Sequence, residues 1–113
     1  MKRVARLPLA AVASGELVRV PHPPFDILVS LVDGAPCAIE DACNHAGASL
    51  ALGERDESGK CVVCPVHAYI FDLATGACVA PKGLCDDQRK YVARVEGSDV
   101  VIYDPLDVVI LGM

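Results

Sequence analysis

The 113-residue sequence lacks any apolar run that approaches the roughly 20 residues needed to span a membrane. It also lacks clustered Lys and Arg, and its formal net charge of -5 at pH 7 argues against a nucleic-acid surface. A phosphate-binding glycine motif and a Ser-His-Asp arrangement are missing as well. We therefore expect no nucleic-acid partner, no membrane partner and none of these common catalytic machineries. The acidic balance fits a protein that docks on basic partners.

The first residues, MKRVARLPLAAVASG, share features with a secretory signal peptide, since Lys2 and Arg3 precede an apolar run. Arg6 and Pro8 interrupt that run, and the uncharged stretch 7–13 is too short for a hydrophobic region with a cleavage site. We therefore predict a cytoplasmic chain. In that reducing compartment, the six cysteines should be metal ligands or buried small side chains rather than disulfides.

Short β-branched runs dominate both ends of the chain and predict an all-β fold in one domain. The expected strands are 16–20, 26–32, 37–41, 91–96 and 99–103. Asp33-Gly34 and Gly97-Ser98 are typical of tight hairpins, so neighbouring strands should pair antiparallel. Only residues 8–15 favour a brief helix. Residues 41–84 differ, because they hold four of the six cysteines and two of the three histidines, which indicates an insert built around a site.

Within CVVCPVHAYIFD, residues 61–72, Cys64 can pair as a metal ligand with either Cys61 or His67. Residues three apart on a strand point to opposite faces, and Val62-Val63 favours extended backbone. Cys61 should therefore lie on the strand that delivers Cys64 to a loop. Cys64 and His67 are then the better pair.

A second pair, Cys43 and His45, stands in a glycine-bearing loop with 18 residues between His45 and Cys64. Each of the two loops thus brings one thiolate and one imidazole. Zinc binds two Cys and two His tetrahedrally, whereas a Rieske-type 2Fe-2S centre takes two Cys on one iron and two His on the other. Zinc fingers usually pair Cys with Cys and His with His, so one Cys and one His in each loop favours the two-iron cluster. A zinc-stabilised interaction domain is the alternative.

The segments CNHAGASL (43–50) and CPVHAYIFDLATG (64–76) resemble the two cluster-binding boxes of Rieske ferredoxins. The flanking SLVDGAPCAIED and YVARVEGSDVVI extend this resemblance over most of the chain. It implies the Rieske fold, an antiparallel β-sandwich base (1–42 and 83–113) with an inserted cluster-binding subdomain (43–82).

The resemblance also implies one [2Fe-2S] cluster, with Cys43 and Cys64 on the inner iron and His45 and His67 on the exposed one. The expected function is that of a soluble, monomeric electron carrier between a flavin-containing or iron-sulfur reductase and a terminal oxygenase, itself a Rieske non-heme iron enzyme. The chain should be no oxygenase itself, because a mononuclear iron site needs two more His and a carboxylate, and only His22 remains. A small Rieske-like subunit of a reductase complex is a further alternative.

The chain departs from the family pattern at Ala68, where a Gly usually follows the second His, and at Val66, where Trp is frequent. A positive φ at Ala68 would cost on the order of 1 kcal/mol. High-potential relatives place Ser and Tyr donors where this chain has Tyr69 and Phe71, so a low reduction potential is expected. Burial by packing is expected for the four other cysteines: Cys37, Cys61, Cys78 and Cys85.

Overall fold

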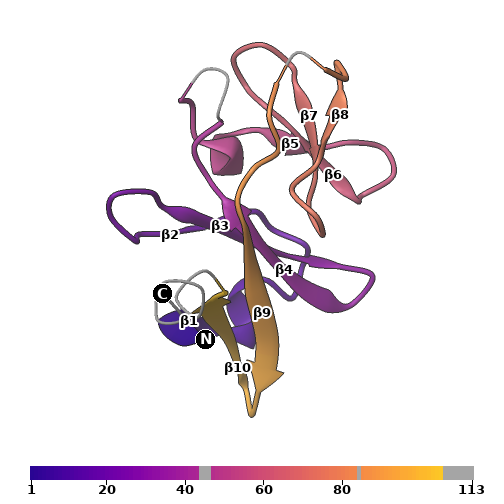
Figure 1. Cartoon of the computed structure of the whole chain (residues 1–113). Coiled ribbons are helices and arrows are strands. Elements are labelled where there is room, and N and C mark those ends of the chain that lie inside the picture. Colours follow the sequence, from indigo (N-terminus) through magenta and orange to yellow (C-terminus); the bar gives the residue numbers. More distant parts are fainter. Residues whose placement is uncertain (44–46, 84, 106–113) are drawn as a thin grey trace.

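A computed structural model describes residues 1–43, 47–83 and 85–105. Its strands form two antiparallel sheets, drawn as the lower and upper parts of Figure 1. The six-stranded sheet has the order β1-β10-β9-β4-β3-β2, and the four-stranded sheet has the order β5-β6-β7-β8. The elements are β1 (Lys2–Pro8), the 3-10 helix η1 (Leu9–Ala11), β2 (Val18–Val20), β3 (Ile27–Val32), β4 (Ala35–Glu40), the 3-10 helix η2 (Leu50–Leu52), β5 (Glu54–Arg55), β6 (Cys61–Val63), β7 (Ile70–Asp72), β8 (Cys78–Ala80), β9 (Lys90–Glu96) and β10 (Asp99–Asp104).

The expected all-β class and antiparallel hairpins are confirmed, and each predicted strand overlaps an observed one. The brief helix expected at 8–15 is the single turn η1. Strand β1 was not predicted, because its charged residues obscure the strand pattern. On β1 Leu7 enters the core, whereas Arg6 lies outside and forms an ion pair with Asp99, with its Nε 2.6 Å from the carboxylate.

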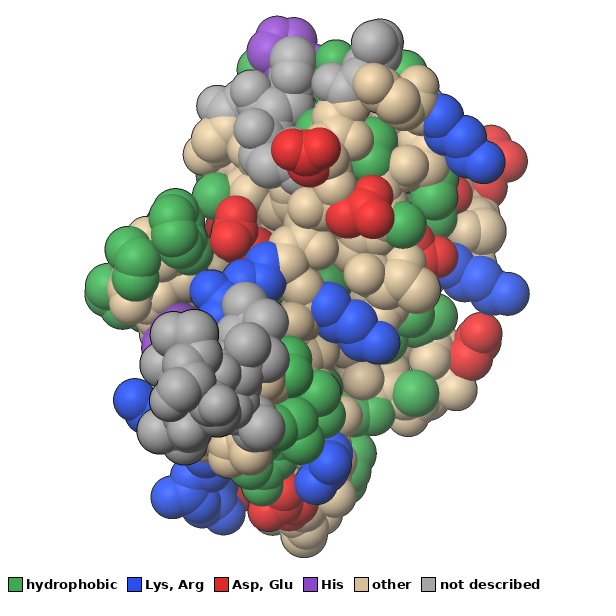
Figure 2. Space-filling model, viewed as in Figure 1, with side chains coloured by type: hydrophobic (Ala, Val, Ile, Leu, Met, Phe, Trp, Pro, Cys, Tyr) green, Lys and Arg blue, Asp and Glu red, His purple; other side chains and the backbone are tan. Residues whose placement is uncertain are grey.

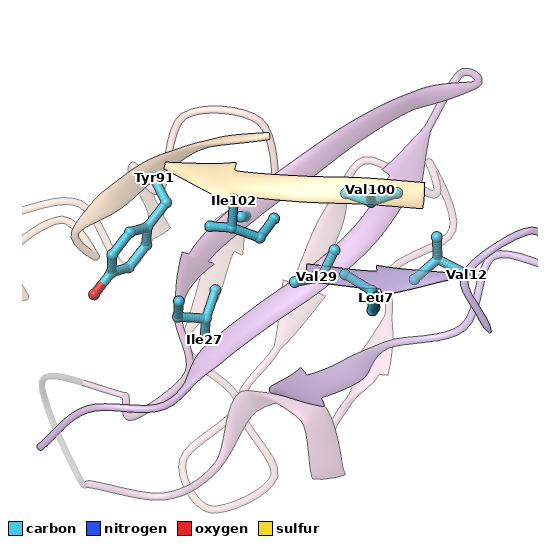
Figure 3. Packing of buried hydrophobic residues seen from close by; sticks show 8 residues of the cluster. Leu7, Val12, Ile27, Val29, Tyr91, Val100 and Ile102 are labelled. Carbon is cyan, nitrogen blue, oxygen red and sulfur yellow. The ribbon is translucent and has the colours of Figure 1, made fainter. Parts of the chain in front are cut away.

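The core of the six-stranded sheet is built by one face of its strands, which curl so that β1 and β10 lie against β3 (Figure 3). Ile27 and Val29 are fully buried there, as are Val100 and Ile102. Their alternation along β3 and β10 is the period of two that a half-buried strand requires. The buried members of this first core are Leu7, Val12, Ile27, Val29, Ala38, Tyr91, Val100 and Ile102.

Strands β3 and β4 also bury their opposite face, against which the half of the chain with the four-stranded sheet packs. Leu28 lies between Ile27 and Val29, and it enters a second core together with Ile39 of β4. The near-continuous apolar run of β3 follows from this burial on both faces. The remaining buried members of the second core come from the segment 43–73: Cys43, Leu50, Val62, Cys64, Phe71 and Leu73.

Arg55 joins the two sheets through hydrogen bonds, and Gln88 ties the end of β4 to the segment before β9. Arg55 of β5 donates to the carbonyl of Leu31 and to the Ser30 hydroxyl on β3, and its Nη1 lies 2.6 Å from the Gly59 carbonyl. Gln88, which is 4% exposed, donates from Nε2 to the carbonyl oxygens of Glu40 (2.9 Å) and Ala42 (2.7 Å). The contacts of Gln88 fix the end of β4, from which the first box departs.

Gly76 holds a contact that no other residue can make. Its φ is +79°, and an added Cβ would lie 2.4 Å from the carbonyl oxygen of Gln88, whose N–H donates to the Gly76 carbonyl over 2.7 Å. Gly76→Ala should lower the free energy of unfolding by about 2–4 kcal/mol, since backbone strain and overlap add. Urea denaturation measures the change.

Gly97→Ala is the matched control for this prediction. Gly97 has a φ of +66°, but its added Cβ would meet nothing within 4 Å. Its substitution should therefore lower the free energy of unfolding by only about 1 kcal/mol, which is the strain of the left-handed backbone alone. Equal losses in the two variants would contradict the close approach at Gly76.

Candidate metal centre

The second box is a loop between β6 and β7, as its sequence predicts. Cys61 lies on β6 and pairs with Asp72, while Cys64 follows the end of that strand. The Cys64 N–H donates to the carbonyl of Tyr69 over 2.8 Å, and the Ala68 N–H donates back to the carbonyl of Cys64 over 3.0 Å. Cys61 is thus in the strand and Cys64 in the loop that also bears His67.

The first box has the same closure. The Cys43 N–H donates to the carbonyl of Ala48 over 2.8 Å, and the Gly47 N–H donates to the carbonyl of Cys43 over 2.6 Å. Both boxes therefore close with a bond from the Cys N–H to the fifth residue after it and a bond from the fourth residue back to the Cys carbonyl. His45 lies outside the described residues.

The fourth position after each Cys has a left-handed backbone. Gly47 has a φ of +73° there, and Ala68 has a φ of +56° in the second box. The positive φ that the sequence comparison raised for the residue after His67 is therefore present, and Ala68 carries the backbone strain that a glycine would avoid. The two boxes are the same backbone turn made once with Gly and once with Ala.

The two thiols and the imidazole differ sharply in exposure. Cys43 and Cys64 are 1% and 2% exposed in the second core, where Phe71 is one of their neighbours, while His67 is exposed. Figure 2 shows a histidine side chain at the surface of the end of the molecule formed by β5–β8. Such a donor set, with sulfur inside and imidazole outside, fits a cluster that has a buried and an exposed iron.

The aromatic residues beside the second box differ in what they offer. Phe71 is fully buried on β7 and has no polar atom to donate. The ring of Tyr69 packs against the second core, and its edge meets the His67 ring at a centroid distance of 6.4 Å. The residue that stands where high-potential relatives have a Tyr donor is thus a hydrocarbon in the core.

Asp41 supports the first box, a role that sequence reasoning missed. It is 2% exposed, and its carboxylate accepts from the Ser49 hydroxyl (2.5 Å) and from the Ala51 N–H (2.8 Å). The Arg19 Nε lies 3.8 Å from the same carboxylate, so the buried charge faces a cation. The signal available in the sequence is an acidic residue two positions before Cys43, where a strand ends.

The four cysteines outside the boxes are half-buried rather than fully buried, so their expected burial is only partial. None of the six cysteines forms a disulfide. Burial, followed by the nearby sulfurs of Cys78 and Cys43, raises the pKa of the Cys85 thiol to about 11. Burial also raises the pKa of Cys37 and of Cys61.

Within 1–43, 47–83 and 85–105, no three His, Cys, Asp or Glu side chains gather in a way that would hold a metal ion.

No helix among the described residues is long and apolar enough to cross a membrane.

A family model for the Rieske [2Fe-2S] domain matches residues 6–84. The 3-phenylpropionate/cinnamic acid dioxygenase ferredoxin subunit of Shigella boydii serotype 4 (strain Sb227) is 38% identical over 106 residues, which are 90% of this chain and 93% of that protein.

Two solved structures are similar over most of the chain. The Sphingomonas yanoikuyae B1 ferredoxin is 31% identical, with a TM-score of 0.78, over 92% of this chain and 100% of that one. A chain from the complex of reduced oxygenase and oxidized ferredoxin in carbazole 1,9a-dioxygenase is 26% identical, with a TM-score of 0.74, over 84% of this chain and 95% of that one. These matches decide between the two-iron and zinc alternatives. The chain belongs to the Rieske [2Fe-2S] family and is a Rieske-type ferredoxin, an electron carrier with one [2Fe-2S] cluster.

Proposed function

We propose that Cys43, His45, Cys64 and His67 hold the cluster, with the two thiolates on the inner iron and the two imidazoles on the outer one. The observation that carries this assignment is the paired loop closure, which sets Cys43 and Cys64 at equivalent positions and buries both sulfurs. When bound, the cluster supplies one-electron redox chemistry. The protein holds the sulfur side in a dry core and leaves His67 at the surface, where an electron can leave or enter.

The end of the molecule that bears His67 also offers a surface for docking. Leu52 and Val66 are 76% and 57% exposed. A groove beside Leu52 is lined by Leu52, Gly53, Glu54, Val63, Cys64 and Pro65. Exposed apolar side chains beside a redox site favour a protein partner that excludes water from the path of the electron. We therefore place both partners at this end.

The charge of the cluster-bearing half favours basic partners. Residues 41–88 contain seven acidic and three basic residues, so they hold -4 of the net charge of -5. Acidic side chains are visible on this half in Figure 2. Because complementary charge speeds encounter, a basic rim around the partner's redox centre would steer the two proteins together.

The proposed partners are a terminal Rieske non-heme iron oxygenase and a flavin-containing or iron-sulfur reductase, and the carrier itself is a monomer in the cytoplasm. Support for the oxygenase comes from the relatives, one named as a dioxygenase ferredoxin subunit and one solved in a complex of oxygenase and ferredoxin. Six cysteines without a disulfide suit a reducing compartment.

The ligand assignment predicts which substitutions remove the cluster signal. His45→Cys and His67→Cys should alter or abolish the spectrum of the reduced protein, because mixed His and Cys ligation gives a lower average g value than ligation by Cys alone. Electron paramagnetic resonance, with iron and sulfide analysis, measures this. The control is Cys61→Ser, which should keep the signal because Cys61 lies on β6. Loss of the cluster from a folded Cys61→Ser protein would overturn the assignment.

The strain at the second box predicts opposite effects at its two equivalent positions. Ala68→Gly should raise the free energy of unfolding by about 0.5–1 kcal/mol, because glycine relieves the left-handed strain but gains freedom in the unfolded chain. Gly47→Ala should lower it by a similar amount, since its added Cβ meets nothing within 4 Å. Urea denaturation of the cluster-loaded proteins, followed by circular dichroism, provides the values. Changes of the same sign would contradict the equivalence of the boxes.

The hydrocarbon environment of the sulfurs predicts a low reduction potential. Hydrogen bonds to the sulfurs favour the more negative reduced state, and Phe71 donates none. We expect a potential near the low end of the Rieske range, about -150 mV, and an increase in the Tyr69→Ser, Phe71→Tyr double variant. Protein-film voltammetry at neutral pH measures both. A wild-type value well above zero would contradict a carrier that drives oxygenase chemistry.

A further inference from the structure

Asp41 is the one buried acidic residue in the part of the chain that the structure describes. It stands two residues before the proposed ligand Cys43. Its backbone N–H donates to the carbonyl of Asp26 over 2.9 Å, and its carbonyl accepts from the N–H of Leu50 over 2.8 Å. The residue therefore has a fixed place between the start of β3 and the last residue of the first box.

The contacts of the Asp41 carboxylate leave its negative charge in place. The carboxylate accepts from the Ser49 hydroxyl over 2.5 Å and from the Ala51 N–H over 2.8 Å, and both donors are neutral. Hydrogen bonds from neutral donors stabilise a carboxylate without cancelling its charge. Among the described side chains, the cation within 4 Å of it is Arg19, whose Nε lies 3.8 Å away.

Arg19 is shared between two carboxylates and lies closer to the other one. Its Nε and Nη2 are 2.7 Å and 2.6 Å from the Asp26 carboxylate. Hydrogen bonds from the His22 N–H and from Arg19 lower the pKa of Asp26, so that partner keeps its negative charge. Two carboxylates and one guanidinium leave one net negative charge. The Arg19 side chain is 54% exposed and that of Asp41 is buried, so solvent screens the cation more than the anion.

We propose that Asp41 tunes the reduction potential of the cluster through its buried charge, an inference that rests on the proposed ligand Cys43. Reduction adds one electron, so a fixed negative charge beside the first box disfavours the reduced cluster. Asp41 thus lowers the potential, and Arg19 opposes it. This effect acts in the same direction as the lack of a hydrogen-bond donor at Phe71.

The experiment compares the midpoint potentials of cluster-loaded variants by protein-film voltammetry at neutral pH. Asp41→Asn replaces the carboxylate by a neutral amide of the same shape, which keeps an oxygen that can accept from the Ala51 N–H. The equilibrium constant for reduction should increase by a factor of about three to ten, which is about 30–60 mV upward for one electron. Arg19→Gln removes the opposing cation and should shift the potential downward.

Asp99→Asn is the matched control. Asp99 is also paired with an arginine, since Arg6 Nε lies 2.6 Å from its carboxylate, but it lies at the β9–β10 hairpin, at the end of the molecule opposite β5–β8 (Figure 1). Its substitution should leave the potential unchanged. At about 1 M salt, where the Debye length is about 3 Å, the shift in Asp41→Asn should persist because the charge is buried, whereas the shift in Arg19→Gln should shrink.

Electron paramagnetic resonance of each variant shows whether the cluster is intact. With an intact Rieske spectrum, an unchanged or lower potential in Asp41→Asn would overturn the proposal, as would an equal shift in Asp99→Asn. If Asp41→Asn binds no cluster, Arg19→Gln decides, because it keeps the bonds of Asp41 to the box: a lower potential supports the proposal and an unchanged one contradicts it.

The wild-type spectrum separates this proposal from the ligand assignment. A wild-type protein without a Rieske spectrum would contradict the assignment of Cys43 and the other ligands. A normal Rieske spectrum, with a potential that neither Asp41→Asn nor Arg19→Gln moves, would contradict only the role of Asp41.

Discussion

Burial of Cys43 and Cys64 in an apolar core shared by the two sheets is the constraint on which the rest of the structure depends. The small cluster-bearing sheet has strands of two or three residues, too short to enclose an interior of its own. It relies on Leu28 and Ile39, which the six-stranded sheet presents on its outer face. Full burial of one such side chain contributes about 1.5–3 kcal/mol, so the base both stabilises the site and places its sulfurs.

Hydrogen bonds from polar side chains add to this apolar contact. Asp41 and Arg55 each connect the six-stranded sheet to a loop or strand of the cluster-bearing half through buried or partly buried hydrogen bonds, and Gln88 ties the end of β4 to the segment that precedes β9. A buried polar group that loses its partner is costly, so these hydrogen bonds favour the one arrangement of the two sheets in which every partner is in place. The two boxes close with the same backbone turn, although His45 follows its Cys by two residues and His67 follows its Cys by three.

The sequence allowed much of this to be predicted, for identifiable reasons. Alternation and hairpin residues indicated the central strands, and the adjacent Val62-Val63 separated the strand residue Cys61 from the loop residue Cys64. Residues 2–8 and the buried role of Gln88 escaped prediction, because each depends on partners far along the chain. Strand β1 exists through pairing with β10, and Gln88 reaches carbonyl oxygens 46 and 48 residues away. No local pattern reports such contacts.

The contrast between buried sulfurs and an exposed imidazole bears on how fast an electron can move. When charge arrives at a redox centre, the surrounding dipoles must turn, and water turns most. In the proposed ligand set the inner side is formed by Cys43 and Cys64, which are buried in the apolar core, so few dipoles there respond. Near the exposed His67 the response is carried by solvent, which a partner docked as proposed would displace. Docking as proposed would therefore lower the reorganisation energy and favour transfer between the two docked proteins over transfer in a chance encounter.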